Sequence, residues 1–570
     1  MKGILFKKLT VAAIASCMAL GSMAGLASAA EATESEGRYS LSYSENIVTI
    51  ESGQILGRVD NDVYTYLGIP YAKAERFQMP EKADSWEGIR PCLVYKEVSP
   101  QVLPTTVGNE KFWTVAPLSM EYQNEDCQYL NVWSTDLEPE TPKAVMVFFH
   151  GGGYASGSAT ECVAQDLADM AKYGDVVTVS VNHRLNVFGF MDVSDYGEEY
   201  KYSGNAGVGD MVAALEWVRD NIAQFGGDPN NVTIFGQSGG GSKVTTLLGT
   251  PAAKGLFHKA IAQSGGANNR SQESAKADTA AIMEYLGATT IDDLLAASTQ
   301  ELVDAYAAVG GSFGPTVDGD YYPVSTFADG VYSDLSSDIP TMIGTTFGEF
   351  ASNGVPIVGE GGISSNTEGM TEEEVLAQLT EKYTEEYAAD ILEAFKKAYP
   401  DHDVKDALYC NFRAWNAEES ASYTGFALGK DLGWSAIEKA KVSEAPVYSY
   451  VFAWTYPIFG GVTATHGADL AFCFHTIDRF KTLTQDSPVA YELQDVVCTA
   501  WTNFAKTGDP SQDGLTWDPV TEDNGAVMIF DENSEVRYFH DKELMELMNK
   551  GTAAASAAAE AEGNEAAEVE

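Results

Sequence analysis

One serine stands among four glycines in the stretch FGQSGGGSKV, which spans residues 235–244. Glycine loses more backbone freedom on folding than any other residue, so this density indicates either a flexible linker or a turn that side chains would obstruct. The flanking sequence favours the turn. Residues 230–235 are rich in β-branched and aromatic residues, as buried strands are, and residues 242–249 are typical of a helix that ends near Pro251.

A strand, a tight turn and a helix in this order match the G-x-S-x-G nucleophile elbow, with Ser238 at its centre. In such an elbow the serine hydroxyl is exposed at the apex of a strained turn, where bulky neighbours would clash. Turns rich in glycine and serine are also common without any catalytic role. The elbow therefore needs chemical partners elsewhere in the chain.

Charge limits the partners that we expect. The chain of 570 residues has a formal net charge of −48, and 45% of its residues are hydrophobic, enough for a large core. Nucleic-acid phosphates and anionic membrane surfaces would be repelled by this charge, so neither is an expected partner. The alternative meaning of the charge is simply solubility, and no obligate protein partner is evident.

The N-terminus is typical of a secretory signal peptide over residues 1–29. Lys2, Lys7 and Lys8 precede an apolar run over residues 9–26, and the small residues ASA at 27–29 match a cleavage site. The alternatives are a single membrane anchor, or lipoprotein processing at Cys17. Because the apolar run continues well past Cys17, we expect a secreted, extracellular protein.

Six cysteines lie beyond this segment, and none has the spacing of a metal ligand pair. They are Cys92, Cys127, Cys162, Cys410, Cys473 and Cys498. Six cysteines allow 15 pairings, so the sequence leaves any disulfides open. Isolated cysteines are most often small buried residues.

Strand-like and helix-like segments alternate along the chain, which predicts an α/β fold with a large, mostly parallel sheet and helices on both faces. We expect one domain over residues 30–550. An acidic tail rich in Ala and Glu follows over residues 551–570, and we expect it to be disordered or a fraying helix. The predicted strands lie within residues 143–150, 175–182, 259–265, 339–345 and 446–454, and a long amphipathic helix is expected over residues 207–225.

A serine nucleophile also needs donors for the oxyanion that forms during acyl transfer. The motif HGGG at residues 150–153 directly follows a predicted strand, as in esterases, where its backbone N–H groups act with that of the residue after the nucleophile. The predicted donors are Gly152, Gly153 and Gly239. The alternative is a purely structural glycine turn.

The base and the acid follow from chain order, since α/β-hydrolases run Ser, then Asp or Glu, then His. His466, beside Gly467, lies on a loop after the last predicted core strand, although a single loop histidine is often an ordinary surface residue. Glu349 follows a late strand directly, and it is the favoured acid. Asp318 is the rival, but it comes before that strand.

At this point the sequence resembles the type B carboxylesterases, the group that includes para-nitrobenzyl esterases and cholinesterases. The resemblance covers residues 47–549 and rests on the stretches YLGIPYAKAERFQMP, NEDCQYLNVW, FFHGGGYASGS, NHRLNVFGFM, GNAGVGDMVAALEWVRDNIAQFGGDPNNVTIFGQSGGG, IGTTFGEF and THGADLAFCF. It implies the α/β-hydrolase fold and a Ser238–Glu349–His466 triad. It also implies a buried ion pair between Arg76 and Glu125.

Three positions depart from the family's usual pattern. Gly239 stands where alanine is usual, and Gln237 stands where glutamate is usual, which leaves substrate preference open. We expect alanine at position 239 to be tolerated. Ser99 replaces the cysteine that often pairs with the one in EDC, so Cys127 is expected to be unpaired, or paired with Cys92.

The sequence therefore predicts a secreted serine carboxylesterase that acts on a small-molecule ester and requires no metal or cofactor. A non-catalytic adhesion or binding protein of the same fold is the alternative from another class. The presence of all three triad residues argues against it. An amide or lactone hydrolase is a further alternative that the sequence does not separate.

Overall fold

The computed structural model describes residues 39–40, 46–102, 122–160, 167–328, 330–350, 357–359, 362–364, 369–411, 413–422, 428–458 and 460–568. The predicted signal peptide over residues 1–29, including Cys17, lies outside the described residues, and so does Cys162. Among the described helices, none combines the length and the apolar character that crossing a membrane requires.

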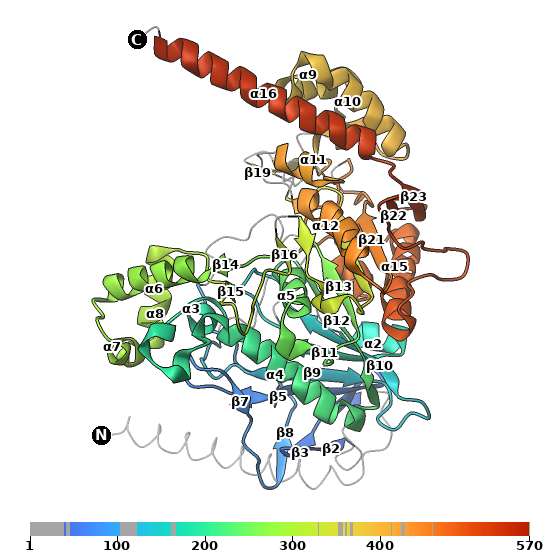
Figure 1. Ribbon diagram of the computed structural model, residues 1–570. Coiled ribbons are helices and arrows are strands. Elements are labelled where there is room, and N and C mark those ends of the chain that lie inside the picture. Colours follow the sequence, from blue (N-terminus) through green and yellow to red (C-terminus); the bar gives the residue numbers. More distant parts are fainter. Residues whose placement is uncertain are drawn as a thin grey trace, which may run out of the picture.

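A sheet of 12 described strands runs through the molecule (Figure 1). Neighbours are parallel from β11 to β22, whereas the pairs β1–β4, β4–β5, β5–β9, β9–β11 and β22–β23 are antiparallel. In spatial order the strands are β1 (Tyr39–Ser40), β4 (Arg58–Asp60), β5 (Val63–Pro70), β9 (Tyr129–Ser134), β11 (Val177–Val181), β10 (Lys143–Phe149), β12 (Gly227–Gln237), β13 (Lys259–Gln263), β18 (Thr341–Thr346), β21 (Val447–Phe452), β22 (Ala526–Phe530) and β23 (Glu535–Tyr538).

The predicted core strands are confirmed, with shifted ends. Every residue of β11, β13, β18 and β21 is buried, as parallel strands covered on both faces should be. Helices α2 (Ala168–Gly174) and α15 (Pro488–Thr507) pack on each other and on the sheet. Helices α4 (Ala206–Asn221), α5 (Gly239–Leu248) and α12 (Leu428–Val442) also pack on it.

Further helices and short sheets surround this centre. The helices are α3 (Asn186–Phe190), α6 (Gln272–Leu286), α7 (Ile291–Ala296), α8 (Thr299–Val309), α9 (Glu372–Tyr383), α10 (Glu385–Ala398), α11 (Ala417–Ser422), α13 (Leu470–Cys473), α14 (Lys481–Thr484) and α16 (Lys542–Glu568). The short strands are β2 (Ile47–Ile50), β3 (Gly53–Leu56), β6 (Ala72–Lys73), β7 (Glu81–Lys82), β8 (Ile89–Pro91), β14 (Arg270–Ser271), β15 (Thr316–Val317), β16 (Phe327–Ala328), β17 (Val331–Tyr332), β19 (Ile357–Gly359) and β20 (Gly362–Ser364).

The tail that was predicted to be disordered or a fraying helix belongs to α16, which starts beside α10 and α9 and projects beyond them as it continues through residues 551–568 (Figure 1). Alanine and glutamate, which dominate this stretch, are strong helix formers. Leu544, Met545 and Met548 in its first turns are buried. Beyond Ala555 the described side chains, Ser556 to Glu560, are exposed, so intrinsic propensity rather than packing favours the helix there.

Parallel strands place their carboxyl ends at the same edge of the sheet, where open α/β folds bind ligands. The segments that carry the predicted site residues follow β10, β12, β18 and β21, which are neighbours or near neighbours in the sheet. The topology therefore gathers at one edge residues that are more than 300 positions apart in the chain.

Candidate active site

Ser238 lies between the end of β12 at Gln237 and the start of α5 at Gly239, and its φ of 60° is unusual for a residue with a side chain. The predicted strand, turn and helix are present, although the helix begins earlier than expected. Glycine is required beside the serine because a Cβ on Gly240 would lie 2.0 Å from the carbonyl oxygen of Phe149. The glycines thus form the tight turn and do not make a linker.

His466 and Glu349 form a hydrogen-bonded pair, with His466 Nδ1 lying 2.5 Å from Glu349 Oε2. Both side chains are buried, with 6% and 1% of their surface exposed. The backbone ties the two loops together, since the His466 N–H donates to the Glu349 carbonyl over 2.7 Å. The structure therefore brings together the acid and the base that chain order predicted.

The second carboxylate oxygen of Glu349 accepts two further hydrogen bonds. The Ser264 hydroxyl donates to Oε1 over 2.7 Å, and the Thr346 N–H donates to the same oxygen over 2.8 Å. These bonds hold the carboxylate in one orientation toward the imidazole. Sequence reasoning did not identify Ser264, because it follows β13 in a stretch with no motif of its own.

Asp318, the rival acid, serves its own turn instead. Its Oδ1 accepts from the N–H groups of Asp320 and Tyr322 over 2.9 and 3.0 Å, and its Oδ2 accepts from Asn205 Nδ2 over 3.0 Å. Short polar side chains commonly bond nearby backbone in this way. The geometry separates the two candidates in favour of Glu349.

The other ring nitrogen of His466, Nε2, lies 3.2 Å from the amide nitrogen of Gln237. Among the hydrogen bonds of the described residues, none joins Ser238 to this nitrogen, although both side chains border one pocket. With Nδ1 donating to Glu349, Nε2 carries a lone pair that can accept from the Gln237 amide. Phe350 covers the ring, with centroids 4.1 Å apart in a stacked arrangement.

The glycine loop approaches the elbow very closely. Gly152 and Gly153 have φ values of 82° and 65°, which favour glycine, and Gly153 and Gly239 line the same pocket as Ser238. A Cβ on Gly239 would lie 2.2 Å from the backbone nitrogen of Gly153. Alanine at position 239 therefore requires the Gly153 backbone to shift, which counts against the expected tolerance, since the loop occupies the space that a methyl group needs.

The ion pair between Arg76 and Glu125 is present and bidentate, with distances of 2.5 and 2.8 Å. It is only partly buried, since 16% and 25% of the two side chains are exposed. A second pair, between Arg184 and Asp210, is more deeply buried, with 3% and 0% exposed. Arg184 and Asp210 lie in two of the stretches that resemble the family, but no sequence pattern predicted that they pair.

Cys127 and Cys92 are both unpaired and buried, as are the other described cysteines outside the signal segment. Burial raises the pKa of the Cys92 thiol to about 11 and that of Cys127 further, so both are thiols at neutral pH. Ser99, which replaces the usual partner cysteine, forms a hydrogen bond with Cys127. A disulfide between Cys127 and Cys92 is therefore excluded in this structure.

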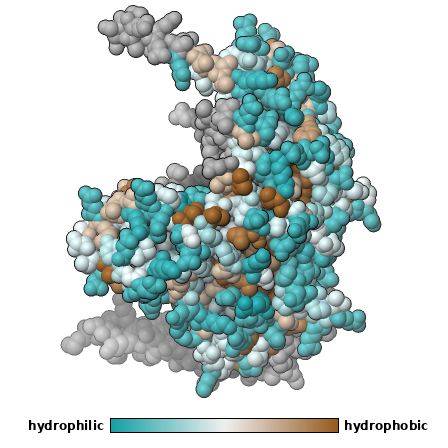
Figure 2. All heavy atoms as spheres, viewed as in Figure 1, coloured by the Kyte–Doolittle hydropathy of each residue, from teal (hydrophilic) through white to brown (hydrophobic). Residues whose placement is uncertain are grey.

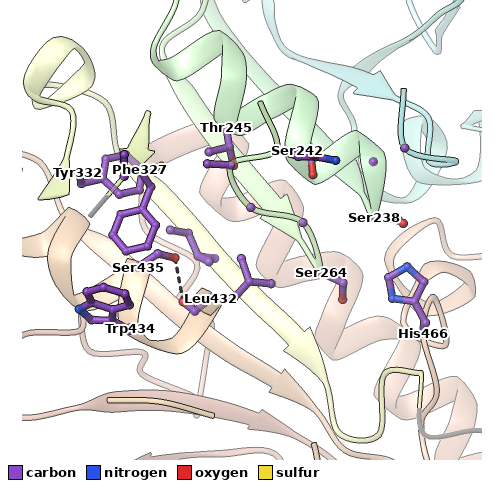
Figure 3. Close-up of a pocket in the computed structure, with 18 of the residues that line it drawn as sticks. Ser238, Ser242, Thr245, Ser264, Phe327, Tyr332, Leu432, Trp434, Ser435 and His466 are labelled. Carbon is purple, nitrogen blue, oxygen red and sulfur yellow. Dashed lines mark hydrogen bonds between the residues drawn. The ribbon is translucent and has the colours of Figure 1, made fainter. Parts of the chain in front are cut away.

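A cavity of about 610 Å³ adjoins Ser238 and His466 (Figure 3). Figure 3 shows these two residues at one end and Phe327, Tyr332, Leu432 and Trp434 at the other. Among the described lining residues there is no Asp, Glu, Lys or Arg. Figure 2 shows a largely hydrophilic face with hydrophobic residues gathered near its middle, where β16, α12 and α5 lie in Figure 1.

The residues that line the pocket include aromatic side chains at the end far from Ser238. The lining comprises Gly153, Ser238, Gly239, Ser242, Thr245, Ser264, Gly265, Gly266, Ala267, Asn268, Phe327, Ala328, Gly330, Tyr332, Ile343, Phe350, Leu432, Trp434, Ser435 and His466. Trp434 and Phe327 meet edge to face at 5.0 Å between centroids. Nothing in the local sequence marked them, because an aromatic residue on a helix or short strand is usually core.

Comparison with known proteins agrees with this geometry. The sequence profile of the Carboxylesterase family matches residues 44–548. The chain belongs to the carboxylesterase family. Its relatives include the para-nitrobenzyl esterase of Bacillus subtilis (strain 168), with 30% identity over 87% of this chain and 96% of the relative. They also include neuroligin-2 of Mus musculus, with 32% identity over 84% of this chain and 60% of the relative.

Solved structures of carboxylesterases have the same α/β-hydrolase fold. An esterase from anaerobic Clostridium hathewayi, described as able to hydrolyse aliphatic aromatic polyesters, is 35% identical with a TM-score of 0.79. The alignment covers 90% of this chain and 100% of that one. A thermophilic para-nitrobenzyl esterase is 30% identical with a TM-score of 0.68, over 88% and 99%. These comparisons identify the protein as a carboxylic ester hydrolase.

Proposed function

We propose that this carboxylesterase hydrolyses its substrate through an acyl-enzyme formed on Ser238. His466 Nε2 takes the hydroxyl proton as Ser238 Oγ attacks the ester carbonyl, and it then gives that proton to the leaving alcohol. Water attacks the acyl-enzyme with His466 again as base, which releases the carboxylic acid and restores Ser238. Glu349 orients the imidazole and stabilises its cationic form.

The observation that carries this proposal is the buried pair between Glu349 and His466 at 2.5 Å, beside the pocket that Ser238 borders. In the free enzyme Gln237 occupies the neighbourhood of Nε2, so Ser238 must take its place as substrate binds. Catalytic hydrogen bonds are often loose before substrate binds. The N–H groups of Gly152, Gly153 and Gly239 are the proposed oxyanion donors.

The pocket favours a neutral ester with one bulky apolar group. Its far end is aromatic and aliphatic, and its described lining has no Asp, Glu, Lys or Arg. Burying an uncompensated charge there would be costly, which disfavours cationic or carboxylate-bearing substrates. The names of the related para-nitrobenzyl and polyester-hydrolysing esterases support an aromatic group at this position.

The decisive experiment replaces Ser238 with alanine. We expect the variant to fold normally by circular dichroism and to lose on the order of a millionfold in kcat on an activated aryl ester, as triad removal does elsewhere. Covalent labelling of the protein by a fluorophosphonate should also disappear in this variant. Full retention of labelling in Ser238→Ala would place the nucleophile at another residue.

The same assay distinguishes catalysis from the alternative function, a non-catalytic adhesion or binding protein, which the similarity to neuroligin keeps open. A wild-type protein that neither hydrolyses a panel of esters of graded size nor reacts with the fluorophosphonate would support binding rather than catalysis. Matched anilides and lactones in the panel would reveal an amidase or lactonase. We expect esters to be hydrolysed fastest.

We also propose that the protein is exported, on the basis of the basic, apolar and small-residue pattern over residues 1–29. Mass spectrometry of the mature protein tests this. Processing after Ala29 is expected, whereas lipid on an N-terminal Cys17 would indicate membrane anchoring.

A further inference from the structure

Lys243 is a buried lysine on the helix that follows the nucleophile. It is the fifth residue of α5, counting from the residue after Ser238, and none of its surface is exposed. Its ammonium group donates hydrogen bonds to the carbonyl oxygens of His150 and Gly151, over 2.7 and 3.4 Å. These two residues begin the glycine loop, which lies 92 positions earlier in the chain.

The two carbonyl groups belong to the peptide units that lead into the proposed oxyanion donors. The Gly151 carbonyl and the Gly152 N–H form one planar peptide group, so a bond that fixes the oxygen also fixes the direction of the N–H. A hydrogen bond donated to the carbonyl oxygen further polarises that peptide and makes its N–H a stronger donor. Lys243 thus contacts the loop through its carbonyl oxygens, which in a trans peptide point away from the N–H of the same peptide group.

Aromatic rings lie close to the Lys243 side chain. His150 and His183 stack with ring centroids 5.0 Å apart, close to the ammonium group. Burial first, and then the charge of Lys243, hold the pKa of each imidazole well below its usual range. The ring of Tyr154 lies 5.7 Å from Nζ and supplies a cation–π contact.

We propose that Lys243 is a positioning residue for the oxyanion hole, holding the loop at residues 150–153 by its carbonyl groups. This inference rests on the hydrolysis proposed above. Charge develops on the substrate oxygen mainly in the tetrahedral state. Loss of Lys243 should therefore lower kcat and the affinity for tetrahedral anionic adducts, while KM changes little.

The test compares Lys243→Met with a matched control, Lys259→Met. Lys259 is also buried and donates to Asn231, but it begins β13 at the opposite edge of the sheet. We expect Lys243→Met to lose about a hundredfold in kcat, the scale of one misplaced oxyanion contact, with KM within threefold. The control should keep kcat within threefold of the wild type.

A second measurement does not depend on turnover. An aryl boronic acid adds Ser238 Oγ to form an anionic tetrahedral boronate while the serine proton passes to His466. Calorimetry should show an affinity at least tenfold lower in Lys243→Met than in Lys259→Met. The wild type could bind the boronate, and lose that affinity on Lys243→Met, yet hydrolyse no ester. In that case the proposed function fails and the role of Lys243 stands.

If Lys243→Met does not fold, Lys243→Gln replaces it, because its amide nitrogen is one bond too short to reach both carbonyls. The same direction of change is expected, by at least tenfold. A folded variant of either kind with kcat and boronate affinity within threefold of the Lys259→Met control would overturn the proposal.

Discussion

At the residue scale, the strained backbone of Ser238 is maintained by its neighbours. Residues in such conformations cost about 1–3 kcal/mol each and persist only where the surroundings enforce them. The Ser238 N–H donates to the Gln263 carbonyl over 2.8 Å, and the Ser242 N–H donates to the Ser238 carbonyl over 3.0 Å. Bonds on both sides of the residue thus hold the φ of 60° that directs the hydroxyl to the pocket.

The acid can be tested by comparing two isosteric changes. Glu349→Gln keeps the shape of the side chain but removes the charge that stabilises the imidazolium, so we expect kcat to fall at least a thousandfold. Asp318→Asn should cost less than threefold in kcat, because Asp318 bonds its own turn and Asn205. The measurement is kcat on one activated ester. The reverse ranking would assign the acid to Asp318.

A substitution at Gly239 tests how closely the loop at residues 150–153 approaches the turn at Ser238. We expect Gly239→Ala to lower kcat by about a hundredfold, because the new methyl group must displace the Gly153 backbone, and small displacements at a reacting centre are costly. Gly314→Ala is the control, since its Cβ would meet no atom closer than 3.4 Å, and kcat within threefold of the wild type is expected there. Activity of Gly239→Ala within tenfold of the wild type would show that the loop has room.

At the scale of elements, His402 connects the segment after α10 to the loops that follow β18 and β22. It follows α10, and its ring nitrogens lie 3.2 Å from Asp406 and 3.0 Å from Asp531, which follows β22. Its ring also stacks on Phe347, just after β18, at 4.9 Å. Burial by itself lowers the pKa of His402, but hydrogen bonds and charges from the two carboxylates outweigh it and raise the pKa to about 9.

The contacts of His402 with Asp406 and Asp531 make the free energy of unfolding depend on pH. The folded protein binds the His402 proton more tightly than the unfolded chain, whose histidine pKa is about 6.5. The stabilisation is therefore complete below pH of about 6.5 and is lost as pH rises through about 9, by roughly 3 kcal/mol at most. The Tm of the wild type should fall over this range, and that of His402→Gln should change much less. Parallel curves for the two proteins would contradict this account.

At the scale of the whole molecule, the buried side chains among the described residues of α16 lie near its start. Its first turns bury Leu544, Met545 and Met548, and just before it Asp541 pairs with Arg413 at 2.6 Å in a buried ion pair. Each of the three apolar side chains contributes about 1.5–3 kcal/mol when buried. The later residues, from Ser556 to Glu560, are exposed and should contribute almost nothing.

Two truncations test this division. A chain that ends at Ala555 should keep its Tm within about 2 °C, since only exposed helix is removed from the described part of the tail. A chain that ends at Asp541 should unfold at a much lower temperature or fail to accumulate, because it loses about 5 kcal/mol of buried apolar contact. Equal stability of the two chains would show that α16 does not support the fold.

The sequence by itself determined the parts of this protein that depend on local pattern. Near-continuous apolar runs marked the parallel strands, and the glycines around Ser238 and Gly153 marked the two turns, because each pattern reflects the geometry of a few adjacent residues. Chain order sufficed to rank Glu349 above Asp318. The Ala- and Glu-rich tail was predicted to be disordered or a fraying helix, and its described residues are helical, as alanine and glutamate favour.

Only the tertiary structure decided the contacts between distant segments. A lysine is normally expected at the surface, and nothing near Lys243 in the sequence indicated that it would be buried against the carbonyls of His150 and Gly151. The position of Gln237 beside His466, and the absence of space for a methyl group at Gly239, likewise depend on how separate loops meet at the edge of the sheet. Local patterns specify strands and turns, whereas strand order and packing determine which side chains touch.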